Sequence, residues 1–359
     1  MSAQPLSTTT EAPLQTRPES AGSRLRELLI GTPEIGIVAA VIVAFAVFAA
    51  INSDFASGAE LQNLGIDLAG FAILAVGESF CIITGGIDLS VGSLTALFCV
   101  VSAWLNVTEG VPVIFTFLIV IAFGGLWGLF HGLLITKLGL APFVVTLFTF
   151  IFAAGLDEAM AVNPIPITSS VFLGVVGSTV AGVPIAVIVL VVIAVVAWFA
   201  LERTYLGRQI YAVGGNQEAA RLAGIPVQRR VMLVYVISGA CSAVVGVIVA
   251  SHITSGTADS VSGWELIAIA ASVIGGVSLI GGQGRIIGVV AGAALLVVLR
   301  DGLVAVNVNA YYQSMVVGLV LLLAIVVDRL RIIRLERSGK RVRRVAPVSS
   351  TELSASDGS

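Results

Sequence analysis

Two glycines interrupt a long apolar run at Gly85 and Gly86, and two carboxylates stand on either side of them. Asp88 follows the break, where it can cap the next helix by accepting hydrogen bonds from the amides of Ser90 or Val91. Glu78 lies about two helical turns before the break. An ionisable side chain this deep in an apolar run is costly and faces either a polar path or a neighbouring helix. We therefore name Glu78, Gly85, Gly86 and Asp88 as candidate path residues, with helix capping as the alternative for Asp88 and a helix–helix bond as the alternative for Glu78.

A second segment, residues 203–230, combines basic residues with the punctuation of a short helix. Asn216 is a good N-cap, and Glu218 and Arg221 complement the two ends of the helix dipole. The sequence thus predicts a helix over 217–223 that is too short to be stable alone. Its small face must pack on a partner protein or on the underside of the same chain. The residues of that small face are Ala219, Ala220 and Ala223.

Several kinds of chemistry are missing from the sequence. A phosphate-binding loop needs Gly-Lys followed by Ser or Thr, but the two lysines are Lys137, after Thr136, and Lys340, before Arg341. No Gly-x-Ser-x-Gly elbow or paired metal motif is present, and the two histidines, His131 and His252, stand alone in the sequence. We therefore expect no enzyme activity, no metal site and no cofactor bound by this chain.

The composition indicates whether water or lipid surrounds the folded protein. Hydrophobic residues make up 57% of the chain and charged residues 11%, with a mean hydropathy of +1.06. A soluble domain carries roughly a quarter charged residues, so lipid must cover most of this surface. Apolar runs long enough to cross a membrane predict an all-α protein of about ten spans. The runs lie near 35–51, 61–84, 89–105, 112–135, 141–158, 181–201, 231–251, 264–280, 286–304 and 312–328.

Glycines within these runs predict close helix packing. Gly124, Gly128 and Gly132 recur every four residues, a spacing that lets two helix backbones approach each other in a membrane.

Charge placement orients the spans. The loops that would face the cytoplasm hold Lys137, the arginines of 203–230 and Arg285, and a basic cluster follows residue 328. The opposite loops hold only acidic charges. The positive-inside rule then places both termini in the cytoplasm. Arg300 is an exception near an outer end, where it can pair with Asp301 or extend toward the interface.

These observations divide the chain into three parts. Residues 1–32 form a polar, disordered cytoplasmic tail, 33–330 the membrane domain, and 331–359 a basic and then polar cytoplasmic tail. The basic cluster beside the last span favours contact with anionic membrane lipid rather than nucleic acid.

Three blocks together carry a family resemblance. Residues 84–93, TGGIDLSVGS, resemble the signature of the ribose, xylose and arabinose-type permeases of bacterial ABC importers. Residues 207–225 are similar to that family's cytoplasmic ATPase-coupling loop, and Gly275-Gly276 with Ser278 and Gly281-Gly282 resemble its third block.

The resemblance implies a permease subunit in the bacterial inner membrane that translocates a pentose or hexose. It further implies a homodimer around one path, a separate cytoplasmic ATPase that uses the ATP, and an extracytoplasmic sugar-binding protein. The residues that we expect to couple to that ATPase are Gly215, Asn216, Glu218, Ala219, Ala220, Arg221 and Gly224. From the residues alone, a proton-coupled secondary transporter or a channel remains the alternative.

Overall fold

The computed structural model describes residues 33–309, together with scattered residues between 311 and 326. Within that part, eight helical segments are long and apolar enough to span a membrane. They are α2 (Pro33–Ile51), α3 (Gly58–Ile83), α4 (Val91–Ala103) with its π-helical extension to Thr108, α5 (Val113–Lys137), α6 (Pro142–Met160), α8 (Ile185–Trp198) with a similar extension to Arg203, α11 (Val227–His252) and α13 (Ile286–Ala305). The polytopic all-α fold is thereby confirmed.

Shorter elements connect these spans. The helices are α7 (Ser170–Gly177), α9 (Tyr205–Gly215), α10 (Gln217–Leu222) and α12 (Trp264–Ile274), with 3-10 turns η1 (Ser53–Ala56) and η4 (Ala258–Val261). Two antiparallel pairs of two-residue strands, β1 (Ile165–Pro166) with β4 (Ser255–Gly256) and β2 (Thr179–Val180) with β3 (Val183–Pro184), lie at one end of the bundle.

Two of the ten expected spans need comment. The run predicted over 264–280 is interrupted at Gly275, so α12 has 11 residues. At 1.5 Å per residue it covers about half of the ~30 Å hydrocarbon layer. The tenth run, 312–328, lies largely outside the described residues, as do the two tails.

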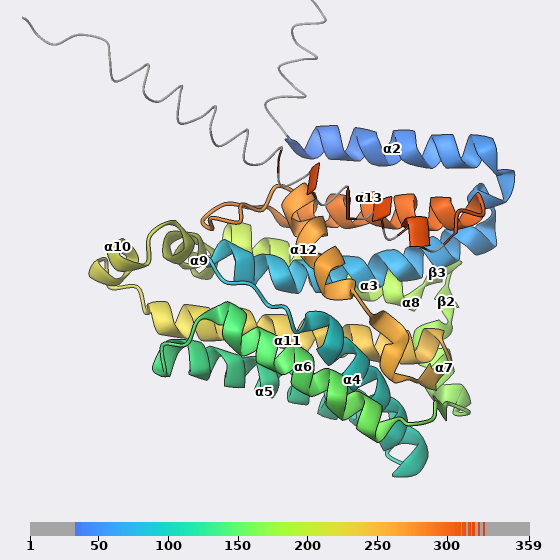
Figure 1. Cartoon of the computed structure of the whole chain (residues 1–359), viewed down its shortest axis with the longest axis horizontal. Helices are drawn as coiled ribbons and strands as arrows, with labels where there is room; N and C mark the ends of the chain where they lie inside the picture. Colours follow the sequence, from blue (N-terminus) through green and yellow to red (C-terminus); the bar gives the residue numbers. More distant parts are fainter. Residues whose placement is uncertain are drawn as a thin grey trace, which may run out of the picture.

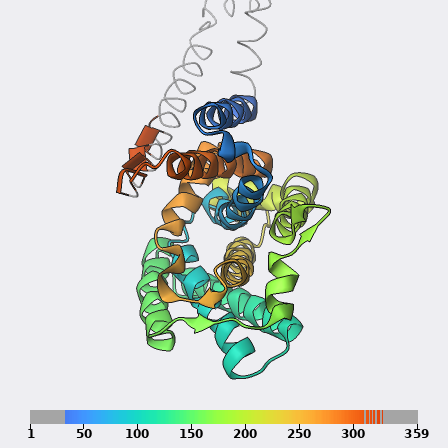
Figure 2. The same cartoon turned by 90° about the vertical axis from the view of Figure 1, so that its right-hand side faces the viewer.

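The centre of the bundle is α11, which packs against α3, α4 and α5 (Figure 2). On the far side of α3, α13 packs against α12 and α2. Glycines make the closest helix contact possible: a Cβ added to Gly128 of α5 would lie 2.0 Å from the carbonyl oxygen of Tyr235, and one added to Gly124 2.4 Å from that of Gly239. The predicted glycine-mediated packing is therefore confirmed.

The two ends of the bundle differ in charge. The end that carries α9 and α10, on the left in Figure 1, holds the arginines of 203–230. Lys137 bonds there to Gln228 at the start of α11, and Arg285 follows Gly284, which bonds to Tyr211 of α9. The Arg285 guanidinium lies 3.2 Å from the Glu34 carboxylate, which places the start of α2 at this same end. Asp54, Glu60 and Glu109 belong to the opposite end. The positive-inside rule makes the α9–α10 end cytoplasmic.

Candidate functional site

The break after α3 begins at the exposed Gly85 and runs inward to the buried, polar Asp88 and Ser90. Gly85 takes the left-handed conformation (φ 84°), and the chain runs without helical hydrogen bonds until α4 begins at Val91. Backbone groups that leave a helix inside a membrane need other partners. One of these is Glu78, which is fully buried and whose Oε1 accepts a hydrogen bond from the backbone N–H of Asp88 at 3.1 Å.

Asp88 holds the break to two neighbouring segments. Its Oδ1 accepts from the Ser90 N–H at 3.0 Å, the predicted hydrogen bond, although Ser90 rather than Asp88 is the N-cap of α4. Its Oδ2 accepts from the Ser238 hydroxyl of α11 at 2.8 Å. Since Asp88 is fully buried, these charge-assisted bonds fix the break against the central helix.

A histidine completes this polar cluster. His131 of α5 lies with Nδ1 4.0 Å from the Asp88 carboxylate, while its Nε2 is 2.7 Å from the Thr149 hydroxyl of α6. His131 is isolated in the sequence, and only the packing of α5 beside the break brings it to Asp88. The cluster therefore ties α3, α5, α6 and α11 together at one depth.

The three family blocks meet just below the break. The backbone N–H of Gly282 donates to the carbonyl oxygen of Ile83, the last residue of α3, at 2.8 Å. A Cβ on Gly214 would lie 1.7 Å from that same oxygen and 2.6 Å from the Gly282 nitrogen. Backbone therefore touches backbone at this point. We call Ile83, Gly214 and Gly282 the glycine junction.

A tyrosine adds a second bond between α9 and the loop before α13. The Tyr211 hydroxyl donates to the carbonyl oxygen of Gly284 at 2.7 Å. Burial, reinforced by the negative charge of Glu202, raises the pKa of Tyr211 to about 12. The hydroxyl therefore remains a protonated donor throughout the physiological pH range.

The short helix α10 directly follows α9, which contains Gly214 of the glycine junction. Its presence confirms the predicted helix. The Asn216 side chain caps it by accepting from the Ala219 N–H at 2.9 Å, and Gly224 ends it in the left-handed conformation (φ 79°). The expected small face is divided, however. Ala220 packs inward with 4% exposure, whereas Ala219 and Ala223 are exposed.

Of the residues predicted at the contact, Ala220 is thus covered by the chain itself, and the docking role of the others stays a prediction. Ala220 supports the helix against its own chain, because α10 contacts both α9 and α11. The outward surface instead carries Leu222, at 82% exposure, beside a solvent-exposed pair of Glu218 and Arg221 whose charged atoms are 3.7 Å apart. Sequence reasoning missed Leu222, although an apolar residue in a polar helix was the available signal.

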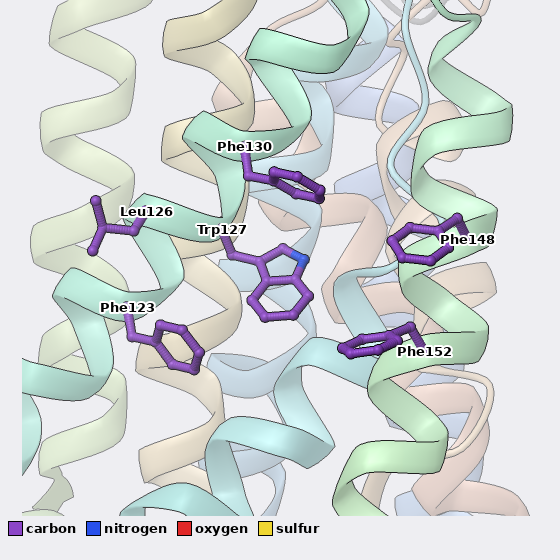
Figure 3. A pocket seen from close by; sticks show the side chains of 6 residues that line it. All are labelled: Phe123, Leu126, Trp127, Phe130, Phe148 and Phe152. Atoms are coloured by element: carbon purple, nitrogen blue, oxygen red, sulfur yellow. The ribbon is translucent and has the colours of Figure 1, made fainter.

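Cavities lie elsewhere in the bundle. An aromatic groove of about 400 Å³ lies between α5 and α6, where Trp127 points across toward Phe148 and Phe152 (Figure 3). A cavity of about 90 Å³ between α4, α6 and α12 is acidic, with Asp157, Glu158 and Glu265 in its wall. A third, of about 120 Å³, lies near the outer ends of α3, α11 and α13. None of these three cavities is lined by the predicted path residues Glu78, Gly85, Gly86 and Asp88.

Comparisons with known proteins match this architecture. The family model described as "Branched-chain amino acid transport system / permease component" matches residues 60–325. The ribose import permease of Haemophilus influenzae is 35% identical over 295 residues, covering 80% of this chain and 91% of that protein. No solved structure matches the chain.

Two Escherichia coli proteins are similarly related. The D-allose transport system permease is 33% identical, over 82% of this chain and 90% of its own length. The L-arabinose transport system permease is 34% identical, over 82% and 90% respectively.

This chain belongs to that permease family. It is a multi-pass subunit of an ABC transporter in the bacterial inner membrane, and ATP hydrolysis belongs to a separate subunit. Family membership decides against the proton-coupled carrier as the alternative. It also explains why the chain carries no phosphate-binding loop of its own.

Proposed function

We propose that this permease imports a monosaccharide of the pentose or hexose class, delivered by an extracytoplasmic binding protein. Its curated relatives named for a sugar are permeases for ribose, D-allose and L-arabinose, each matched over nine tenths of its length. Two copies of the chain enclose one path in this proposal, as the resemblance implies.

The observation that carries the proposal is the position of α10, which packs on α9 and leaves Leu222 exposed at the cytoplasmic end. A six-residue helix projects from the cytoplasmic end with Leu222 uncovered, and it rests on α9, whose Gly214 touches the end of α3. A helix this short gains its stability from packing rather than from propensity. We assign to it the role of ATPase-coupling helix, with Gly215, Asn216, Glu218, Ala219, Arg221 and Gly224 shaping the contact and Ala220 supporting it from inside.

The break residues then form the inner part of the path. Glu78 and Asp88 are bonded to protein in this conformation, so contact with a sugar requires the break between α3 and α4 to open. The glycine junction is the direct connection between a displacement of α9 and the end of α3. A movement of α10 and α9 would in this way displace the end of α3 and the break residues next to it.

Leu222→Arg tests the coupling assignment. The substitution places a charge in the docking surface while the helix still forms, since arginine's helix propensity is close to leucine's. We expect normal membrane levels but loss of co-purification with the ATPase, and at least a tenfold drop in ATP-driven sugar uptake.

Val162→Arg is the matched control, because Val162 is equally exposed, at 81%, on the outer side. It should leave ATPase association intact. Full association of the Leu222→Arg permease would remove α10 from the docking surface.

A further inference from the structure

A cavity at the outer side of the bundle has no role in the coupling just described. Its volume is about 120 Å³, and it lies between α3, α11, the start of α12 and α13. Its polar lining residues are Asp67, His252, Ser260, Trp264 and Arg300. All five come from the outer portions of their elements, far along α3 and α11 from the glycine junction.

The two charged groups of this cavity form no hydrogen bond or ion pair with the described residues. The Arg300 guanidinium does not form the expected pair with Asp301, and it lies 5.2 Å from the ring centre of Phe71. Asp67 is likewise without a hydrogen bond or ion pair, although the positive charge of Arg300 acts on it. Such groups at membrane depth are costly unless something in the cavity satisfies them.

The charges in the cavity limit the kinds of molecule that could bind there. A carboxylate and a guanidinium line the same space without contacting each other, so the occupant must offer both donors and acceptors. An anion such as phosphate would face Asp67, and a cation would face Arg300. A neutral molecule with several hydroxyl groups satisfies both at once, because a hydroxyl donates and accepts.

An aromatic wall adds shape selectivity. The Trp264 indole packs edge-on against Phe71, with ring centres 4.4 Å apart, and a Cβ at Gly70 would lie 3.0 Å from it. The indole is thus held in place and offers an apolar surface to the C–H groups of a sugar ring. At about 120 Å³ this space is smaller than the ~150 Å³ cavity that accepts benzene. A sugar ring therefore enters it only in part and extends into the opening beside the exposed His252 and Ile253.

We propose that this cavity is an outer monosaccharide-binding site within each protomer. The sugar ring packs on Trp264, and its hydroxyls bond to Asp67, Arg300 and His252. The site would bind sugar on the outer side, apart from the break that α10 controls. The inference rests on the proposed function, since it takes the transported class of molecule as the ligand.

Equilibrium dialysis of tritiated D-ribose, D-allose and L-arabinose tests the site on the full-length permease in lipid nanodiscs, without ATPase or binding protein. We expect saturable binding of at least one of these sugars, with one molecule per protomer. Arg300→Gln should weaken this binding at least tenfold. Asp67→Asn should weaken it about threefold without disturbing the fold, because Asp67 has no hydrogen bond with the described residues to lose.

Ser251→Ala is the control, since Ser251 does not line the cavity and its buried hydroxyl has no hydrogen-bond partner to lose. It should bind sugar as the wild type does. Absence of saturable binding, or equal binding by the wild type and both cavity variants, would overturn the site. Uptake by the complete reconstituted importer separates the two proposals. If no pentose or hexose is taken up, the proposed function fails; if uptake is normal but the dialysis result is negative, only this inference fails.

Discussion

The two glycine pairs that interrupt helices in this permease, Gly85-Gly86 and Gly275-Gly276, have similar sequences around them but different surroundings. Each pair includes a left-handed glycine, Gly85 at φ 84° and Gly276 at φ 90°. The first leads into a buried segment held by the carboxylates of Glu78 and Asp88. The second leads into a partly exposed turn whose bonds are mostly backbone to backbone, such as the Ser278 N–H to the Gln283 carbonyl at 3.1 Å.

The two breaks differ because their free backbone groups have different hydrogen-bond partners within reach. A break inside the membrane must carry its own hydrogen-bonding side chains, because lipid offers none. A break at the cytoplasmic edge can use water, and it needs only glycines to turn. The two breaks meet where the Gly282 N–H bonds to the Ile83 carbonyl oxygen. The loop that follows Gly275-Gly276 therefore supports the end of α3, where the first break begins.

The largest effect is expected where the breaks meet. Gly214→Ala places a Cβ 1.7 Å from the Ile83 oxygen, with backbone on both sides, so α9 must shift. Overpacking of this kind costs about 1–3 kcal/mol. We expect ATP-driven sugar uptake below a tenth of the wild type. Gly155→Ala in α6 is the matched control, since no atom lies within 4 Å of its added Cβ. Equal uptake by the two variants would show that the close backbone contact at the glycine junction has no part in coupling.

A smaller effect is expected when one side chain is removed from each break and the losses of stability are compared. Asp88→Ala leaves three buried donors, the Ser90 N–H, the Ser90 hydroxyl and the Ser238 hydroxyl, without their acceptor. An unsatisfied buried donor costs about 1–3 kcal/mol, so Tm measured in detergent should fall by several degrees. Ser278→Ala in the second break removes only an exposed 3.4 Å contact and should cost less than about 0.5 kcal/mol. Similar losses from both would erase the distinction between them.

Asp88→Asn sharpens the same comparison, because it keeps an acceptor oxygen. If the break lines the path, this variant should raise the KM for sugar uptake with little change in Tm. A lower Tm with an unchanged KM would leave Asp88 a structural residue alone.

The smallest effect concerns the tie between α9 and the second break. Tyr211→Phe removes the bond to Gly284 and should lower stability by about 1 kcal/mol. Because the folded pKa is raised above the usual 10, this contact stabilises fully below pH 10 and is lost as the pH rises through about 12. The wild-type advantage over Tyr211→Phe should therefore be constant from pH 6 to 9. A steady decline over that window would contradict this account.

Local patterns in the sequence determined much of this protein. Long apolar runs require membrane helices whatever their neighbours are, and Asn216 and Gly224 specify the ends of α10 through bonds and dihedral angles within a few residues. The contact of Asp88 with Ser90 is equally local, at two residues' separation. Such features can be predicted because their physical cause lies within one helical turn.

Tertiary structure decided everything that joins distant segments. Ile83, Gly214 and Gly282 are separated by more than sixty residues each, yet their backbones touch because small residues allow three elements to approach. His131 reaches Asp88, and Arg300 and Asp67 line one cavity, only through the packing of separate helices. Which face of α10 is free was likewise settled by α9 and α11, because the helix's own sequence offers Ala219, Ala220 and Ala223 as similar small surfaces, and packing alone selects which of them is covered.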